Sequence, residues 1–302
     1  MDMTFEPVWG TIIGTYLFLA GLGGAAFAAS TYLRIRKPEC VHIIRYGRVI
    51  APLCVIVGLV LLMVDATAGF HNPLRFALLL TNFGSVMTWG VVFLAVFVVI
   101  ALIVMVMDLL GKGLKVPLWL DVLGAVFGIC VCVYTGCLLG VAKTFPLWNN
   151  ALLPILFLVS AMSTGMAAML LAATIGCRRE FDAVGGFRKF HFFLPIAEMV
   201  LVASLLFITY NSAESAGAAS VMNLVAGKCS VAFWLVFVLL GLVVPTALEW
   251  HLLFFASEAE EKSRMGRILS GTSDGLLLVG GFALRLLVLA AAMPITMVQP
   301  WM

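Results

Sequence analysis

Residues 61–90 read LLMVDATAGFHNPLRFALLLTNFGSVMTWG, and this stretch decides the fold. A long apolar segment ends on the carboxylate of Asp65, a short polar segment with His71 and Arg75 follows, and a second apolar segment begins after Ser85. An ionised carboxylate beside hydrocarbon is costly unless it is paired, hydrated or neutralised. The stretch therefore predicts two membrane-spanning helices, joined by the polar wall of a pocket at one membrane surface.

The composition of the whole chain predicts an all-α polytopic membrane protein. Of its 302 residues, 63% are hydrophobic and 11% are charged, and the mean hydropathy is +1.15. So few polar side chains cannot cover a soluble globule of this size. At about 20 residues per span, the sequence gives candidate transmembrane helices at 9–33, 49–68, 83–107, 117–141, 151–175, 191–210, 231–255 and 275–298.

The loops between these eight helices differ in basic residues. Lys and Arg concentrate in the first, third, fifth and seventh loops, whereas the others hold only Arg75, Lys143 and Lys228. Cytoplasmic loops are enriched in basic residues, so both termini and the 61–90 pocket are predicted to be extracytoplasmic. The segment before the first helix contains no Lys or Arg, which favours an uncleaved helix over a secretory signal.

A faint similarity between YLFLAGLGGAAFAAS in the first helix and ILFLVSAMSTGMAAML in the fifth predicts two four-helix bundles, 1–141 and 142–302. The small residues of the first helix fit close helix packing, but they would also leave room for a flat ligand. The sequence leaves both interpretations open.

Cysteine and histidine positions argue against metal centres in this chain. The seven cysteines contain no C-x-x-C pair, which fits neither an iron–sulfur cluster nor a zinc site and favours small core residues. The four histidines place no pair at mid-membrane depth, so no haem is expected.

Three ionisable residues lie inside apolar runs: Glu198, Glu249 and Arg285. Each needs a partner or a wet cavity. They predict either a structural ion-pair cluster or a proton path. A secondary transporter that binds an ion or substrate at these residues is a different hypothesis, and Pro195 and Pro245 support it because either proline could interrupt its helix.

A second polar group is predicted near the extracytoplasmic surface. Tyr16, Asp65, Ser85 and Tyr134 are expected at similar depths, with His71 and Arg75 above them. Tyrosine and histidine can donate to quinone carbonyl oxygens, and a carboxylate or imidazole can exchange protons. This combination predicts a quinone site. Trp148, at the same surface, is expected to be an interfacial anchor.

Several stretches together resemble the NrfD/PsrC family. They are YLFLAGLGGAAF, LLMVD, NPLRF, SVMTWG, VYTGCLLG, PLWNNALLPILFLVSAMSTG and GGFALRLLVLAA, and their order covers essentially the whole chain. The SVMTWG segment distinguishes this resemblance from the related anchors of dimethyl sulfoxide reductases.

The resemblance implies a haem-free subunit of a bacterial or archaeal cytoplasmic membrane. Such a subunit exchanges electrons between menaquinol or quinone and an extracytoplasmic, four-cluster ferredoxin-like iron–sulfur subunit. Beyond that lies a catalytic subunit, either a molybdopterin enzyme or a multihaem cytochrome. The terminal substrate never touches this chain, so the resemblance leaves it open.

The resemblance also implies residue roles. Tyr16, Arg75, Ser85 and Tyr134 fall where the family's quinone-pocket residues are expected, and Glu198, Glu249 and Arg285 match its interior polar positions. Asp65 or His71 is the expected proton acceptor. The choice between them stays open, because Pro73 lies farther behind Asp65 than the family pattern places its proline.

Overall fold

The computed structural model describes residues 9–65, 82–256 and 263–295, and every regular element in these ranges is helical. Eight helices are long and apolar enough to span a membrane, as predicted. These spans are α1 (Thr11–Arg36), α2 (Val41–Asp65), α4 (Val86–Leu109), α5 (Leu118–Gly140), α6 (Leu152–Gly176), α8 (Gly185–Tyr210), the π-helical η3 (Ala232–Val243) continued by α10 (Val244–Phe254), and α12 (Arg264–Ala291). Shorter elements are η2 (Gly113–Lys115), α7 (Arg178–Ala183) and α9 (Ser215–Val225).

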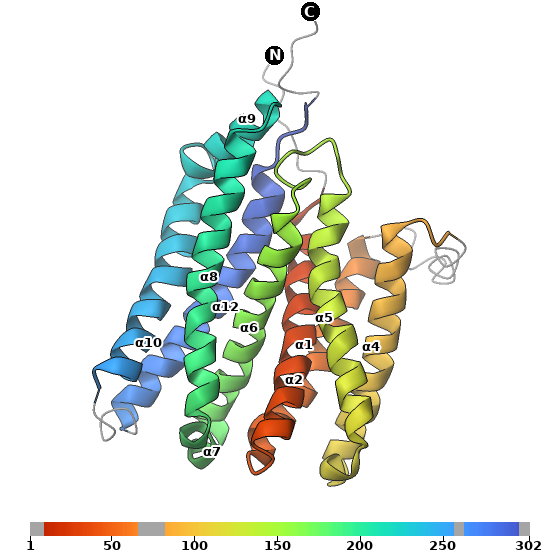
Figure 1. The fold of residues 1–302 in the computed structure, drawn as a ribbon, viewed down its shortest axis with the longest axis vertical. Helices are drawn as coiled ribbons and strands as arrows, with labels where there is room; N and C mark the ends of the chain where they lie inside the picture. The colour runs from red at the N-terminus through yellow and green to blue at the C-terminus, as the bar shows by residue number, and fades with distance from the viewer. Residues whose placement is uncertain (1–8, 66–81, 257–262, 296–302) are drawn as a thin grey trace, which may run out of the picture.

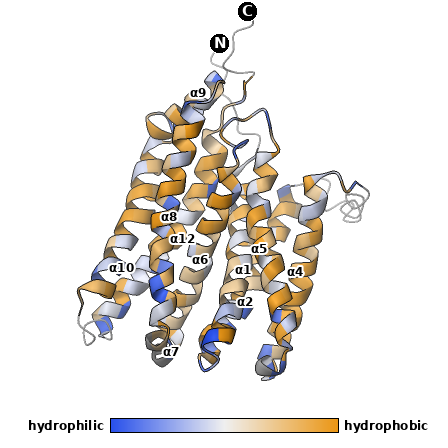
Figure 2. Cartoon of the chain, in the orientation of Figure 1, coloured by the Kyte–Doolittle hydropathy of each residue, from blue (hydrophilic) through white to orange (hydrophobic). Residues whose placement is uncertain are grey.

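Helix α1 occupies the centre of the molecule. It packs against α2, α5, α6 and α12, while α10 packs on α12 and α4 packs on α2 and α5. In Figure 1, α8, α10 and α12 lie on one side, and α2, α4 and α5 lie on the other. Hydrophobic residues cover most of the helix lengths, and hydrophilic residues gather toward the ends (Figure 2). This surface suits helices that contact lipid.

The small residues of α1 allow its neighbours to approach closely. A Cβ atom at Gly24 would collide with the backbone carbonyl of Gly128 in α5, and one at Gly165 of α6 would meet the α1 backbone at Ala25 and Ala26. The described part of α1 thus uses these residues for packing, the first of the two interpretations.

Three spans begin earlier in the chain than the sequence predicted. Helix α2 starts at Val41 instead of 49, α8 at Gly185 instead of 191, and α12 at Arg264 instead of 275. An apolar window ends at the first charged residues, but α2 and α8 continue through Arg48 and Arg188, which pair with buried carboxylates. Helix α12 continues through Asp274, which is itself buried. The predicted ends of the second and eighth spans, at 68 and 298, lie outside the described residues.

A network centred on Arg48 joins α1, α2, α4 and α5 at one end of the molecule. We call this the basic-loop end, because the loops rich in Lys and Arg lie there. The Arg48 side chain is buried and donates to Asp108 Oδ1 at 3.1 Å and Asp121 Oδ2 at 2.6 Å. Arg45 pairs with Asp108 at 2.8 Å, and Arg34 pairs with Asp121. Two carboxylates and three guanidinium groups therefore compensate each other, as buried charges require.

Candidate functional site

Two tyrosines of the predicted quinone site lie in the packed interior. Tyr16 of α1 is 2% exposed and Tyr134 of α5 is 7% exposed, and both belong to the same packed core. Tyr16 packs over Gly58 of α2, where an added Cβ would lie 3.4 Å from the ring. The Tyr134 ring covers Gly90 of α4, and no Cβ would fit there. Two glycines thus make room for two phenols among α1, α2, α4 and α5.

The predicted carboxylate lies nearer the rim than the tyrosines. Asp65 is exposed at the last position of α2, seven residues, or about 10 Å along the axis, beyond Gly58. Ser85 is half-buried at the N-terminal boundary of α4, five residues before Gly90. The sequence predicted that Tyr16, Asp65, Ser85 and Tyr134 lie at similar depths. Two predicted residues, His71 and Arg75, lie outside the described residues.

Trp148 differs from its predicted role as an interfacial anchor. It is 2% exposed, and its indole N–H donates to the carbonyl oxygen of Val288 at 2.8 Å. Its ring stacks on Trp9 with centroids 5.4 Å apart. The residue therefore fastens the α5–α6 connection to α12 and to the start of α1. A hydrophobic ring with a satisfied N–H is suited to such burial.

A second polar group lies where α6, α8 and α12 meet. The guanidinium of Arg285 donates to the Ser160 hydroxyl and to the Phe157 carbonyl, and its carbon lies 4.5 Å from the Phe157 ring centroid. Glu198 is 2% exposed, and its Oε1 atom has no hydrogen-bond partner in the described part of the chain. Arg285 also lies against α1, where a Cβ at Gly21 would be 3.7 Å from its Nη2.

The third predicted interior residue, Glu249 of α10, is fully compensated. Its Oε2 accepts from Arg188 at 3.2 Å, and its Oε1 accepts from Ser270 at 2.7 Å. Glu249 and Arg285 therefore belong to separate groups, because each binds its own partners. The single cluster that was one interpretation of the sequence is in fact two groups at different depths.

Asp274 and His191 connect these two groups. His191 Nδ1 lies 3.8 Å from Asp274 Oδ1, and His191 Nε2 lies 3.0 Å from the carbonyl oxygen of Ser163. Asp274 is 1% exposed, and both of its oxygens lack hydrogen-bond partners among the described residues. A buried carboxylate without donors holds a proton or contacts water, so this pair suits proton exchange.

Helical spacing aligns these residues into one polar column. On α8, Arg188, His191 and Glu198 are three and seven residues apart, and on α12, Ser270 and Asp274 are four apart, so each set shares a face. From Ser270 to Arg285 is fifteen residues, about 22 Å along the axis. A hydrocarbon core is about 30 Å thick. The column therefore covers most of a membrane's depth from the basic-loop end.

The sequence did not predict that Arg188, His191 and Asp274 belong to this column, because the predicted spans placed them at or beyond their edges. The signal that could have found them is their spacing, since positions three, four and seven apart on one helix mark a common face.

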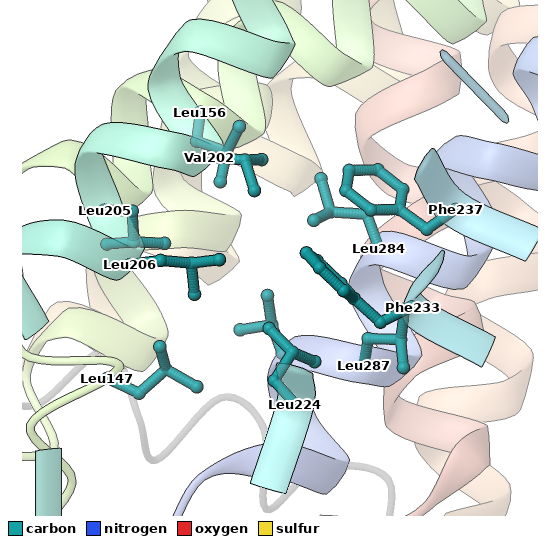
Figure 3. A pocket seen from close by; sticks show the side chains of 11 residues that line it. Leu147, Leu156, Val202, Leu205, Leu206, Leu224, Phe233, Phe237, Leu284 and Leu287 are labelled. Atoms are coloured by element: carbon teal, nitrogen blue, oxygen red, sulfur yellow. The ribbon is translucent and has the colours of Figure 1, made fainter. Parts of the chain in front are cut away.

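An apolar cavity lies beyond this column, toward the end of the molecule where α12 ends. It lies among α6, α8, α9, η3 and α12 and measures about 10 Å³, roughly the room for one water molecule. Its lining side chains, shown in Figure 3, include Leu156, Val202, Phe237 and Leu284. A dry space this small cannot accept a quinone ring.

Comparison with known proteins gives the family. The model of the family described as "Polysulphide reductase, NrfD" matches residues 1–296. The protein is 32% identical to one of the chains of the polysulfide reductase of Wolinella succinogenes, over 80% of its own length and 83% of that relative. It is 27% identical to protein NrfD of Escherichia coli, over 80% and 84% of the two sequences. It is also 28% identical to one of the subunits of the tetrathionate reductase of Salmonella typhimurium, over 52% and 47%. Together with the eight candidate spans among the described residues, the match across nearly its whole length means that the chain belongs to the NrfD family, described as "Polysulphide reductase, NrfD".

Proposed function

We propose that this chain is the quinol-reactive membrane subunit of a respiratory oxidoreductase. It exchanges electrons between menaquinol or a related quinone and an iron–sulfur subunit on the extracytoplasmic face. Membership in a family whose named members are reductase subunits supports an oxidoreductase over a transporter. The observation that carries the quinone assignment is the pair of buried phenols, Tyr16 and Tyr134, packed over glycines below a rim carboxylate.

The residues of this pocket suit a quinone head group. Phenol hydroxyls donate hydrogen bonds to carbonyl oxygens, and apolar walls exclude water from the ring. A quinol supplies two electrons and two protons when it is oxidised. Asp65, which is exposed at the rim, or His71 accepts the two protons one after the other and releases each to water. Arg75 and Ser85 are the other polar residues assigned to the site. Electrons leave toward an iron–sulfur subunit bound at the same end of the helices, and through it reach a catalytic subunit.

We assign the polar column to proton movement between the basic-loop side and this pocket. Glu198 and Asp274 carry exchangeable protons, because each has a buried oxygen without a hydrogen-bond partner among the described residues, and His191 exchanges protons with Asp274, 3.8 Å away. Glu249 is held by Arg188 and Ser270 at the entrance. Arg285 lies against Gly21, five residues from Tyr16 on α1, about 7.5 Å along the axis. Water would bridge this last interval.

Conservative variants of the assembled complex test the quinone site. Tyr16→Phe and Tyr134→Phe each remove one hydroxyl and keep the ring, so we expect quinol oxidation to fall about tenfold for each hydrogen bond lost. Asp65→Asn removes a proton acceptor, and we expect a loss of about 10²-fold or more. The measurement is quinol-dependent turnover per assembled complex.

Tyr210→Phe is the matched control. Tyr210 is exposed at the end of α8 on the same side of the molecule, and its replacement should leave turnover unchanged. Unchanged turnover in the fully assembled Tyr16 and Tyr134 variants would exclude the pocket. Unchanged turnover in Asp65→Asn alone would assign the proton to His71.

A further inference from the structure

We propose that the basic-loop face holds a site for one divalent transition-metal ion of the zinc type, formed by His42, Cys177 and Glu180. A ring nitrogen of His42, the Cys177 Sγ and a carboxylate oxygen of Glu180 all lie within 4.8 Å of one another. The three residues come from two separate segments: the start of α2 supplies His42, and the α6–α7 junction supplies Cys177 and Glu180. The site is independent of the proposed quinone chemistry.

The donor set indicates the class of metal. A thiolate, an imidazole and a carboxylate are typical zinc ligands, whereas Mg²⁺ and Ca²⁺ prefer oxygen alone. Zinc bonds of about 2.0–2.3 Å place ligand atoms roughly 3–4 Å apart, so small side-chain rotations suffice to bring these three donors onto one ion. The His42 side chain is 59% exposed, which leaves an entry path and an open position for water.

Hydrogen bonds already hold the Glu180 carboxylate in position to bind a metal ion. Its Oε2 accepts from the backbone N–H groups of His42 at 2.8 Å and Ile43 at 3.0 Å, while its Oε1 lies 2.6 Å from His42 Nδ1. A metal ion would insert between Oε1 and Nδ1 and leave the backbone contacts intact. Hydrogen bonds of this kind fix ligating carboxylates in metal sites.

A helix cap at the start of α2 accounts for the positions of Glu180 and His42. It does not account for the position of the Cys177 sulfur beside them. The thiol has no part in the contacts to the α2 backbone, yet its sulfur lies with the other two donors. Cys177 therefore separates a metal site from a simple cap, because its replacement removes a ligand and leaves the cap in place.

A metal at this position would act as a structural link. It would join the start of α2 to α7, two elements that also pack together. Along α2, His42 lies 16 residues from Gly58, the glycine that Tyr16 packs against, and 23 residues from Asp65, which is about 24 Å and about 35 Å along the helix axis. The ion would therefore be too far from the tyrosine pocket to take part in its chemistry, and its removal should change stability rather than turnover.

The experiment uses the full-length protein in its purified complex, with any affinity tag removed. After treatment with a chelator, the complex is titrated with Zn²⁺ and metal content is measured by mass spectrometry. A parallel titration with Co²⁺ reports a thiolate ligand through its charge-transfer absorption. We expect one equivalent of metal more than in Cys177→Ser and His42→Gln, and a rise in melting temperature on Zn²⁺ addition that both variants lack.

Two matched control variants should bind as much metal as the wild type and show the same rise in melting temperature. Cys229→Ser changes a half-buried thiol at the other end of the molecule, and His251→Gln changes an exposed imidazole at the end of α10. Equal metal content in the wild type and Cys177→Ser would overturn the site. So would a Co²⁺ spectrum without a thiolate band. The Cys177→Ser variant retains the Glu180 cap, so loss of metal there cannot be ascribed to unfolding of α2.

Discussion

At the scale of single residues, the buried ionisable groups of this protein are of two kinds: those with hydrogen-bond partners and those without. Arg48 is matched by Asp108 and Asp121, and Glu249 by Arg188 and Ser270. Asp274, by contrast, is buried with no hydrogen-bond partner for either oxygen among the described residues, and only His191 lies near it, at 3.8 Å. Compensated charges stabilise helix contacts, whereas an uncompensated carboxylate is a functional candidate.

We expect Asp274→Asn to lower the number of protons moved per electron while the complex still assembles. Asparagine keeps the size of the side chain but cannot exchange a proton, so the column between Glu249 and Glu198 would be interrupted. The measurement is proton movement against quinol turnover in proteoliposomes. Thr209→Val is the control, because Thr209 is a buried residue of α8 whose hydroxyl lacks a partner among the described residues and lies outside the column. An unchanged ratio in Asp274→Asn would remove this residue from the path.

At the scale of helices, glycine contacts set how closely the spans approach. Gly24 and Gly128 bring the backbones of α1 and α5 together, and Gly241 and Gly280 do the same for η3 and α12. The latter contact lies inside a π-helical segment of twelve residues that ends just before Pro245. Proline cannot donate a helix hydrogen bond, which fits a change of helix type at this point. A π-helix is rare and occurs mostly as a single turn within an α-helix, so a segment of twelve residues is unusual.

Gly128→Val should prevent α1 and α5 from packing, because a Cβ there would collide with the carbonyl oxygen of Gly24. The backbone cannot move aside as a flexible side chain would, so we expect the melting temperature and the yield of folded protein to fall, with a cost of about 1–3 kcal/mol or more. Gly275→Ala is the matched control, since no atom lies near its added Cβ and alanine favours a helix by about 0.5–1 kcal/mol. Equal stability of both variants would contradict this packing.

At the scale of the whole molecule, the proposed sites lie at opposite ends. The tyrosine pocket is at the end where α1 begins and α12 ends, and the metal ligands are at the end with the basic loops. On the proposed function, a subunit that accepts electrons would bind at the pocket end. The orientation in the membrane decides which compartment that is, and it rests on the distribution of Lys and Arg.

Labelling from each side of the membrane tests this orientation. We expect a cysteine at Lys112 to react from the cytoplasmic side and one at Lys143 to react from the extracytoplasmic side, because both positions lie in loops that join the spans and the basic loops are predicted to be cytoplasmic. The readout is labelling by a membrane-impermeant maleimide in intact spheroplasts and in inverted vesicles, in a background lacking native reactive thiols. The reverse pattern would place the proposed quinone pocket on the cytoplasmic side.

The sequence by itself determined the class of the protein, the number of spans and the family. These follow from local quantities, since the length of an apolar run and the order of short motifs do not depend on which helices touch. Tyr16 and Tyr134 could be paired in advance because both lie a similar distance from the same end of their helices. Glu198, Glu249 and Arg285 were predicted to be buried because they lie inside apolar runs, and all three are buried.

Only the tertiary structure decided which polar groups meet. Asp274 and His191 lie at positions that an apolar window assigns to the edge of a span, and their alignment depends on helices that continue past that edge. The spacing of cysteines along the sequence argued against a zinc site, yet folding brings Cys177 and Glu180 to His42, 135 and 138 residues away in sequence. Contacts between distant segments arise from helix packing, and packing is a property of the assembled helices that no single stretch of sequence contains.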